Sequence, residues 1–179
     1  MSQIIQPSAT QLADFLQQPE IEGSPAWEFL FGVAQQKPMP TLFHSRLQRN
    51  LVNAINRQTT DYEAIQELRC IVPPLSPVPD IVVVRAERLT ADGALQGAPD
   101  WLIEIRSPDQ GTLELQHKIL HCLAQGTVLA WLIDIQRERI WVWENDELPI
   151  IYAGDNILPT LAGINDLNVT KVISMTQQR

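Results

Sequence analysis

The chain has 179 residues, of which 45% are hydrophobic and 19% are charged. This length suits a single domain over residues 1–179 with a core over about 10–170, and the hydrophobic content excludes wholesale disorder. The formal net charge of −8 argues against a protein that binds nucleic acid indiscriminately through a basic surface. An enzyme in which a divalent metal ion supplies positive charge locally is compatible with that charge.

Composition also indicates a cellular compartment. Charged residues interrupt every apolar stretch, so we expect no membrane span. The first residues, MSQIIQPSATQ, lack the basic head and the long apolar run of a secretion signal. The two cysteines, Cys70 and Cys122, are too few for a disulfide framework and do not have a metal-binding spacing. We therefore expect a cytoplasmic protein.

The first half of the chain alternates helical and strand patterns. Ser8 or Thr10 can cap the first helix, and apolar residues at helical spacing mark the second. The predicted elements, in chain order, are a short helix to about residue 18, a loop over 19–25, a strand over 27–34, a long helix over 41–59 and a strand over 64–72, which a run of prolines ends.

The second half is richer in strands. The segment DIVVVR contains three consecutive valines and is the clearest strand pattern in the chain. The predicted elements are strands over 80–85 and 101–106, a helix over 113–125, a hairpin of strands over 128–135 and 139–144, and two final segments, 157–161 and 169–173, that fit short strands or a terminal helix. This order predicts an α/β domain with a central sheet.

Two acidic residues fall at adjoining ends of neighbouring predicted strands. Asp80 opens one strand, and Glu104 lies near the far end of the next. If the strands pair antiparallel, the two carboxylates meet at one edge of the sheet. Because side chains alternate along a strand, Arg106 should project to the same face as Glu104. The sequence therefore gathers two acids and a cation in one small region.

This grouping suggests metal-dependent hydrolysis. Two neighbouring carboxylates repel each other unless a cation lies between them, and their oxygens are the ligands that Mg²⁺ prefers. A bound Mg²⁺ or Mn²⁺ can activate water and shield the charge that develops on a phosphodiester. Arg106 could stabilise that charge but cannot act as a base, because a guanidinium stays protonated. Lys118 can reach the same site if its helix packs across the strands.

Four ordered segments resemble the Uma-two family of restriction endonuclease-like proteins, within the PD-(D/E)xK nuclease superfamily. They are PDIVVV at 79–84, PDWLIEIRSPDQ at 99–110, KILHCLAQGT at 118–127 and WLIDI at 131–135. The upstream EFLFG at 28–32 and His44 also fit the order of the family, so the resemblance covers roughly residues 10–170. It implies a restriction-endonuclease-like fold, with a central mixed sheet flanked by helices.

The resemblance also implies roles for individual residues. Asp80 and Glu104 would bind Mg²⁺ or Mn²⁺, with the main-chain carbonyl of Ile105 as a further ligand. Lys118 matches a lysine that many members carry on the next helix, although some relatives carry it at the position of the preceding histidine. Arg106 departs from the commoner leucine, and it either partly restores the ExK motif or neutralises the acids and displaces the metal.

The implied activity is a metal-dependent endonuclease that acts on DNA. Many nucleases of this fold are dimers, and the predicted hairpin over 128–144 offers a strand edge, so we expect a homodimer. The main alternative is a catalytically inactive binding or regulatory domain, which the acidic balance and Arg106 favour. A weaker alternative is a hydrolase of RNA or nucleotides on the same fold.

Four other residues invite a functional interpretation that their surroundings make weaker. We expect Glu28 to face solvent from an edge strand and His44 to lie on a helix surface or to contact a partner. His117 and His121 stand four residues apart, which is compatible with zinc, but no third ligand lies at a suitable distance. These four residues are therefore left out of the predicted site.

Overall fold

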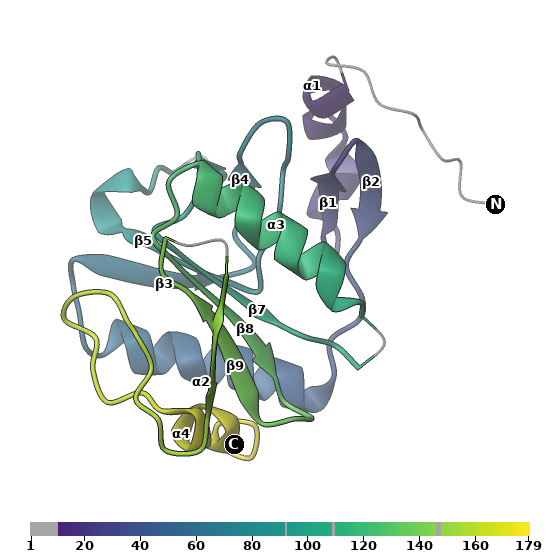
Figure 1. Ribbon diagram of the computed structural model, residues 1–179. Helices are drawn as coiled ribbons and strands as arrows, with labels where there is room; N and C mark the ends of the chain where they lie inside the picture. Colours follow the sequence, from purple (N-terminus) through teal and green to yellow (C-terminus); the bar gives the residue numbers. More distant parts are fainter. Residues whose placement is uncertain (1–10, 92, 109, 146–147) are drawn as a thin grey trace.

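The computed structural model describes residues 11–91, 93–108, 110–145 and 148–179. It is a mixed α/β structure around a six-stranded sheet, as predicted (Figure 1). The sheet has the order β10-β9-β8-β7-β5-β3. Its strands, in chain order, are β3 (Tyr62–Gln66), β5 (Ile81–Arg85), β7 (Trp101–Ile105), β8 (Leu129–Asp134), β9 (Arg139–Trp143) and β10 (Ile150–Ala153).

Helices and short strand pairs surround this sheet. The helices are α1 (Gln11–Leu16), α2 (Leu42–Asn56), α3 (Thr112–Ala124) and α4 (Val169–Ser174), with short 3₁₀ segments η1 (Pro19–Glu22) and η2 (Ala86–Arg88). The additional strand pairs are β1 (Trp27–Leu30) with β2 (Val33–Gln36), and β4 (Cys70–Ile71) with β6 (Leu95–Gln96). Among the described residues, none of these helices has the length and apolar character that a bilayer crossing requires.

Strand direction places the ends of β5 and β7 together. These two strands pair antiparallel, which meets the condition set for bringing the two acids together, with Ile81 opposite Ile103. β7 and β8 are parallel, and the helix α3 makes the crossover that a parallel pair requires. The start of β5 therefore lies beside the carboxyl end of β7, and α3 returns over the same sheet.

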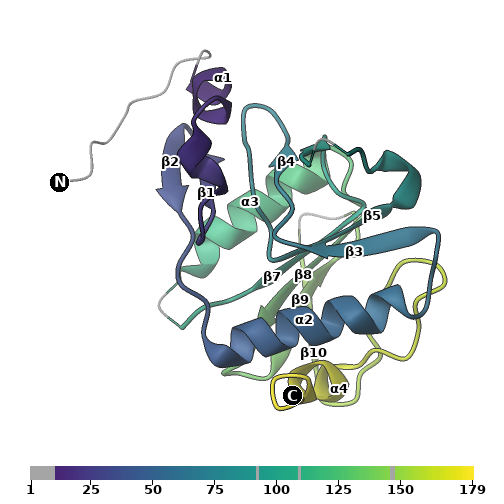
Figure 2. The same ribbon diagram turned by 180° about the vertical axis from the view of Figure 1, so that it is seen from behind.

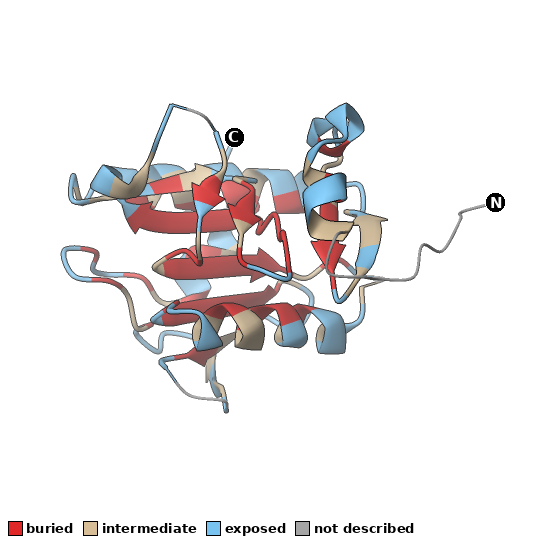
Figure 3. Cartoon of the chain, turned by 90° about the horizontal axis from the view of Figure 1, so that it is seen from above, coloured by how far each residue is buried: buried red, intermediate tan, exposed pale blue. Residues whose placement is uncertain are grey.

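Alternation along the strands produces a core on each face of the sheet. Trp101 and Ile103 of β7 pack with α2 and α4, whereas Leu102 packs with α3. Figure 1 shows α3 across one face, and Figure 2 shows α2 across the other with α4 beside it. The inner strands β5, β7 and β8 are buried between these two layers (Figure 3). Glu104 follows the alternation of Leu102, so it belongs to the α3 face.

Two predicted strands are divided in the structure. Residues 27–34 form parts of a hairpin, because Phe31 and Gly32 have φ values of 50° and 80° and make a tight turn between β1 and β2. Residues 64–72 are interrupted at Glu67, whose φ is 50°, so the chain leaves β3 before it begins β4. Residues other than glycine rarely adopt positive φ, so the residue types at Phe31 and Glu67 did not indicate a break in either strand.

The predicted hairpin of β8 and β9 is confirmed, but the prediction that it supplies a sheet edge is wrong. β9 pairs with β8 on one side and with β10 on the other. β10 was not predicted. The edge of the central sheet at this side is therefore β10.

A short helix lies near each end of the described chain. α1 ends at Leu16, and its predicted caps Ser8 and Thr10 lie outside the described residues. At the other end, the segment over 169–173 is the helix α4, whose cap Asn168 accepts a hydrogen bond from the main-chain nitrogen of Lys171. The segment over 157–161 contributes an isolated bridge between Ile157 and Asn168.

Candidate functional site

The structure brings Asp80 and Glu104 together at one end of the central sheet. Asp80 immediately precedes β5, and its Oδ2 accepts a hydrogen bond of 2.7 Å from the main-chain nitrogen of Ile105 in β7. Asp80 is 3% exposed and Glu104 is 2% exposed. Two carboxylates this deeply buried are costly without cationic partners, so their neighbours decide what the site can do.

Lys118 of α3 is the cationic partner of Glu104. It lies on the sheet-facing side of the helix with Leu115 and Ile119, which are also buried. Its Nζ lies 2.7 Å from Oε1 of Glu104 and 2.9 Å from Oε1 of Glu28 in β1. The same Glu28 oxygen accepts a hydrogen bond from the main chain at residue 78. The expectation that Glu28 faces solvent is therefore wrong, because the β1–β2 hairpin folds over this end of the sheet.

Two further side chains surround Asp80. Lys37, just after β2, places its Nζ 2.8 Å from Oδ1 of Asp80 and also donates a hydrogen bond to the carbonyl of Val78. His44 of α2 places Nε2 3.3 Å from the same Oδ1, so the expected position on the helix surface is wrong. Gln48, one turn further along α2, donates to the main-chain oxygen of Asp80 at 2.6 Å. Asp80 is thus held from β2, α2 and β7.

Arg106 does not join this cluster. β7 ends at Ile105, and the guanidinium of Arg106 lies 3.1 Å from Oδ2 of Asp134 in β8 and donates to the carbonyl of Gln110. The side-chain alternation that predicted a common face with Glu104 stops where the strand stops. Its head therefore does not fill the space between the two acids.

The charges of the cluster shift its ionisation. Burial by itself raises the pKa of Asp80, but Lys37 and His44 hold that pKa well below its usual range. Burial raises the pKa of Glu104 to about 7, and the nearby Asp80 carboxylate adds to this increase. Burial by itself lowers the pKa of Lys118, but the carboxylates of Glu104 and Glu28 outweigh this effect and raise that pKa above its usual value. At neutral pH Asp80 and Lys118 are ionised, and Glu104 is close to its midpoint.

A small cavity lies among these side chains. Its volume is about 10 Å³, roughly that of one water-sized particle, and Asp80, Glu104, Glu28, His44, Lys37 and Lys118 line it. We call it the inner cavity. Oε1 of Glu104 is buried and accepts no hydrogen bond of good geometry from the described residues, although it forms the ion pair with Lys118. This oxygen therefore retains accepting capacity toward the inner cavity.

The donor chemistry of the inner cavity fits a divalent cation. Asp80 and Glu104 supply hard carboxylate oxygens, and Mg²⁺ commonly takes one or two carboxylates and completes its shell with water and phosphate oxygens. Among the residues that the structure describes, no three His, Cys, Asp or Glu side chains are placed to hold a metal ion together. Two carboxylates, the carbonyl of Ile105, water and substrate would have to complete such a shell.

The histidine pair on α3 has other partners. His121 Nε2 lies 2.9 Å from the carbonyl oxygen of Val72. The ring of His117 makes an edge contact with Phe31 in the β1–β2 turn. Both histidines therefore join α3 to neighbouring segments.

A larger pocket adjoins the inner cavity. It has a volume of about 410 Å³ and includes Gln35, Met39 and Glu114 in its lining. We call it the entrance pocket. The two spaces share five lining residues, which form the wall between them: Glu28, Lys37, Pro38, Ser107 and Gln110. A group that reaches the buried carboxylates from solvent can approach through this entrance pocket.

Comparison with known proteins identifies the family. The model of the Uma2 family, described as "putative restriction endonuclease", matches residues 12–170. The chain belongs to the Uma2 family. A solved structure described as a "putative nuclease belonging to DUF820" from Anabaena variabilis is 34% identical, with a TM-score of 0.84, and the match covers 92% of this chain and 98% of that one. No curated protein matches the chain.

The Uma2 segments recognised in the sequence lie on β5, β7, α3 and β8. PDIVVV is the start of β5 with Asp80, and WLIEI is β7 with Glu104. KILHCLAQGT begins at Lys118 in α3, and WLIDI begins in β8 and ends one residue beyond it, at Ile135. The segments of β5, β7 and α3 therefore supply Asp80, Glu104 and Lys118 to the inner cavity, and that of β8 lies in the strand next to β7. Membership of the Uma2 family supports a nuclease-like function for this protein.

Sequence reasoning missed part of the polar cluster. His44 and Gln48 stand on the same stripe of α2 as the buried residues Leu47, Leu51 and Ile55. Polar side chains on a core-facing stripe require buried partners, so this spacing could have predicted that His44 and Gln48 contact buried polar groups. Lys37 follows a short strand and precedes prolines, and its local sequence contains no comparable signal.

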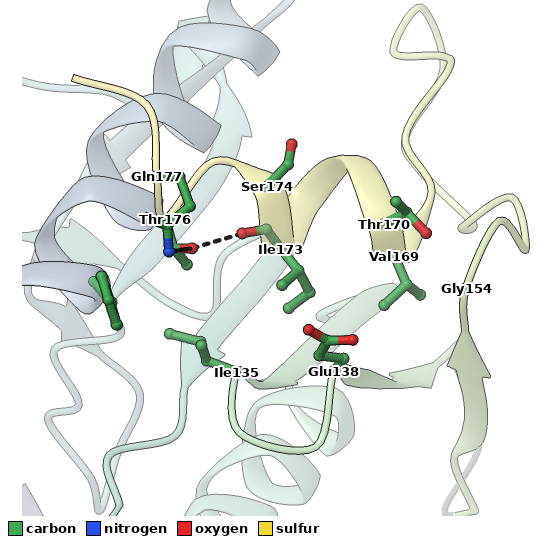
Figure 4. A pocket seen from close by; sticks show the side chains of 10 residues that line it. Ile135, Glu138, Gly154, Val169, Thr170, Ile173, Ser174, Thr176 and Gln177 are labelled. Carbon is green, nitrogen blue, oxygen red and sulfur yellow. Dashed lines mark hydrogen bonds between the residues drawn. The ribbon is translucent and has the colours of Figure 1, made fainter.

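A separate pocket lies beneath α4, away from the acidic cluster. Its volume is about 370 Å³, and Figure 4 shows Val169 and Ile173 pointing into it with Glu138 and Ile135 opposite. Thr176 donates its hydroxyl hydrogen to the carbonyl of Ile173 at its rim. Glu138 is the titratable residue among its described lining, so the pocket lacks the paired acids of the inner cavity.

Proposed function

We propose that this Uma2 protein is a metal-dependent phosphodiester hydrolase of the PD-(D/E)xK type and that its substrate is DNA. Membership of the Uma2 family and the likeness to the nuclease structure support the nuclease-like activity. The observation that carries the metal dependence is the pair Asp80 and Glu104 beside an ion-sized cavity, with Lys118 on Glu104.

The proposal assigns a role to each group around the inner cavity. Asp80, Glu104 and the carbonyl of Ile105 would hold Mg²⁺ or Mn²⁺, which when bound supplies a more acidic water and neutralises phosphate charge. Lys118 would orient the attacking water and stabilise the negative charge that develops on the phosphate oxygens. Since Lys118 keeps its proton, it is not the base. Glu28 is a positioning residue that holds Lys118 in place.

Arg106 has a structural role in this proposal. Its pairing with Asp134 joins the end of β7 to β8, and its guanidinium lies outside the acidic cluster. We therefore propose that Arg106 fastens the end of β7 to β8 and touches neither the metal nor the substrate. An Arg106→Leu variant should retain Mn²⁺ binding. Loss of Mn²⁺ binding would show that the guanidinium of Arg106 is part of the metal site.

Thermal unfolding with and without MnCl₂ tests the metal site. Saturating Mn²⁺ should stabilise the wild type by about 3 kcal/mol at a hundred times its Kd. Asp80→Asn and Glu104→Gln should remove the Mn²⁺ shift and the cleavage of plasmid DNA. Asp134→Asn is a matched control, since Asp134 is likewise a buried carboxylate with cationic partners, here Arg106 and Arg137, and it should keep the shift. An unchanged shift in the first two variants would refute the assignment.

The alternative is a nuclease-fold protein that binds without cleaving. One observation favours it: each acid already has cationic partners, Lys37 and His44 at Asp80 and Lys118 at Glu104. If these pairs were permanent, Mn²⁺ would neither raise the melting temperature nor permit cleavage of supercoiled or single-stranded DNA. A Mn²⁺ shift that Asp80→Asn abolishes, together with cleavage, would reject this alternative.

We extend the proposal to a homodimer joined at β10. In the described residues this strand pairs with β9 on one side and has no strand on the other. Its Ile150 and Ile151 are 58% and 51% exposed. Antiparallel pairing with β10 of a second copy would join the two sheets into one continuous sheet across a two-fold axis. Sedimentation should show a dimer at micromolar concentration and a monomer for Ile151→Lys; a monomeric wild type would contradict it.

A further inference from the structure

Lys37 occupies the side of Asp80 that a metal ion would need. Oδ2 of Asp80 is committed to the main-chain nitrogen of Ile105. Oδ1 is the oxygen that faces Lys37, at 2.8 Å, and His44, at 3.3 Å. The Lys37 side chain is 9% exposed, so its ammonium is largely removed from water at this position. Lys37 is therefore the counter-ion of Asp80 in this state of the protein.

A divalent cation and this ammonium cannot share the inner cavity. The cavity holds roughly one water-sized particle. A cation bound to Oδ1 of Asp80 would lie against Nζ of Lys37, and like charges at such a distance in a buried site repel strongly. Metal binding at Asp80 therefore requires that Lys37 moves.

The entrance pocket is the space into which Lys37 can move. Lys37 lines both the inner cavity and the entrance pocket, so a change in its side-chain rotamers transfers Nζ from one to the other. Its four-carbon chain is flexible, and the next residues, Pro38 and Met39, are exposed. Among the described lining of the entrance pocket Lys37 is the cationic residue, and Glu114 there is already bonded to Gln35.

We propose that Lys37 is a displaceable counter-ion that becomes a substrate-binding residue. Before a divalent cation is present, it neutralises Asp80. When the cation binds, the ammonium turns into the entrance pocket and binds a non-bridging oxygen of the substrate phosphodiester. Metal entry would then add a second phosphate-binding ammonium to that of Lys118 in this acidic protein. The inference rests on the proposed metal-dependent function.

Amine labelling of the wild type tests the displacement without altering the fold. Lys37 should react slowly with an N-hydroxysuccinimide ester in EDTA and at least about tenfold faster in Mn²⁺, as measured by mass spectrometry of its peptide; about 1.4 kcal/mol of released interaction corresponds to that change. Lys171, whose Nζ contacts a main-chain oxygen on the surface, should react equally in both. Equal protection of Lys37 in both conditions would overturn the inference.

Binding measurements test the second role. Lys37→Met should bind Mn²⁺ more tightly than the wild type by calorimetry, because no ammonium competes for Asp80, and should raise the KM for a DNA substrate. Lys171→Met should change neither. Mn²⁺ binding to Lys37→Met that is equal or weaker would contradict the inference while the proposed function stands. A wild type that binds no Mn²⁺ at all would instead defeat the proposed function, and the inference with it.

Discussion

At the residue scale, one ammonium balances two carboxylates. Lys118 pairs with Glu28 and Glu104, and all three side chains are almost completely buried. A buried ion pair contributes little net stability relative to apolar residues, but removal of one partner leaves the other charge uncompensated. Lys118 is therefore the residue in the cluster whose loss the fold should tolerate least.

Replacement of Lys118 tests this balance. Lys118→Met should lower the free energy of unfolding by about 3–5 kcal/mol at pH 7.5, because it leaves two buried carboxylates without their cation. Urea denaturation measures the loss. Lys171→Met, at the surface, should change stability by less than about 0.5 kcal/mol. A loss below about 1 kcal/mol for Lys118→Met would show that the two carboxylates have other compensation.

The raised pKa of Glu104 predicts how the free energy of unfolding of the metal-free protein, measured in EDTA, depends on pH. Its pKa is raised from 4.5 to about 7 in the folded protein. Between these values the folded state keeps a proton that the unfolded state loses, so stability falls as pH rises from about 4.5 to 7, by up to roughly 3 kcal/mol. Glu104→Gln should remove this decline. Parallel pH profiles for the wild type and Glu104→Gln would contradict the prediction.

At the element scale, the strands that carry the two acids were predictable and the covering hairpin was not. Two apolar runs predicted the strands β5 and β7, and their antiparallel pairing, which the sequence left as a condition, brings Asp80 and Glu104 together. The sequence placed Lys118 at the site on condition that its helix packs across the strands, and α3 does so. Glu28 and Lys37 reach the site because the β1–β2 hairpin, distant in sequence, folds over the end of the sheet. The periodicity of a local segment cannot predict such a long-range contact.

The end of a strand explains the misplaced Arg106. Side-chain alternation predicts a common face with Glu104, and it holds through Ile105, where β7 ends. Beyond that point the chain turns, and Asp134 in the adjoining strand binds the guanidinium. Element ends are where sequence patterns are least informative, so a residue one position past a strand cannot be placed by alternation alone.

The tight turn of the β1–β2 hairpin offers a test of its role. Gly32 has a φ of 80°, and Gly32→Ala should cost about 1 kcal/mol of stability because a side chain is strained there. Since this hairpin carries Glu28 and Lys37, the variant should also alter Mn²⁺ binding. Gly154→Ala has comparable strain, with φ 58°, next to β10. If both variants leave the Mn²⁺ Kd unchanged, the hairpin does not control the metal site.

At the scale of the whole molecule, the charge of −8 limits contacts with the DNA backbone. A protein that neutralises few phosphates releases few counter-ions, so its affinity depends weakly on salt. We expect a slope of log Kobs against log salt that corresponds to about three phosphate contacts or fewer. Fluorescence anisotropy in Ca²⁺, between 50 and 200 mM salt, measures it. A slope that corresponds to six or more contacts would indicate a basic surface that the sequence does not suggest.

The acidic pair at the shared end of β5 and β7 is the centre of the account, and anomalous diffraction tests it most directly. Crystals soaked in MnCl₂ and measured near the manganese absorption edge should show one strong peak between the carboxylates of Asp80 and Glu104, with the side chain of Lys37 turned away from Oδ1 of Asp80. Peaks elsewhere on the surface with no density between these two carboxylates, at a Mn²⁺ concentration that supports activity, would contradict the account.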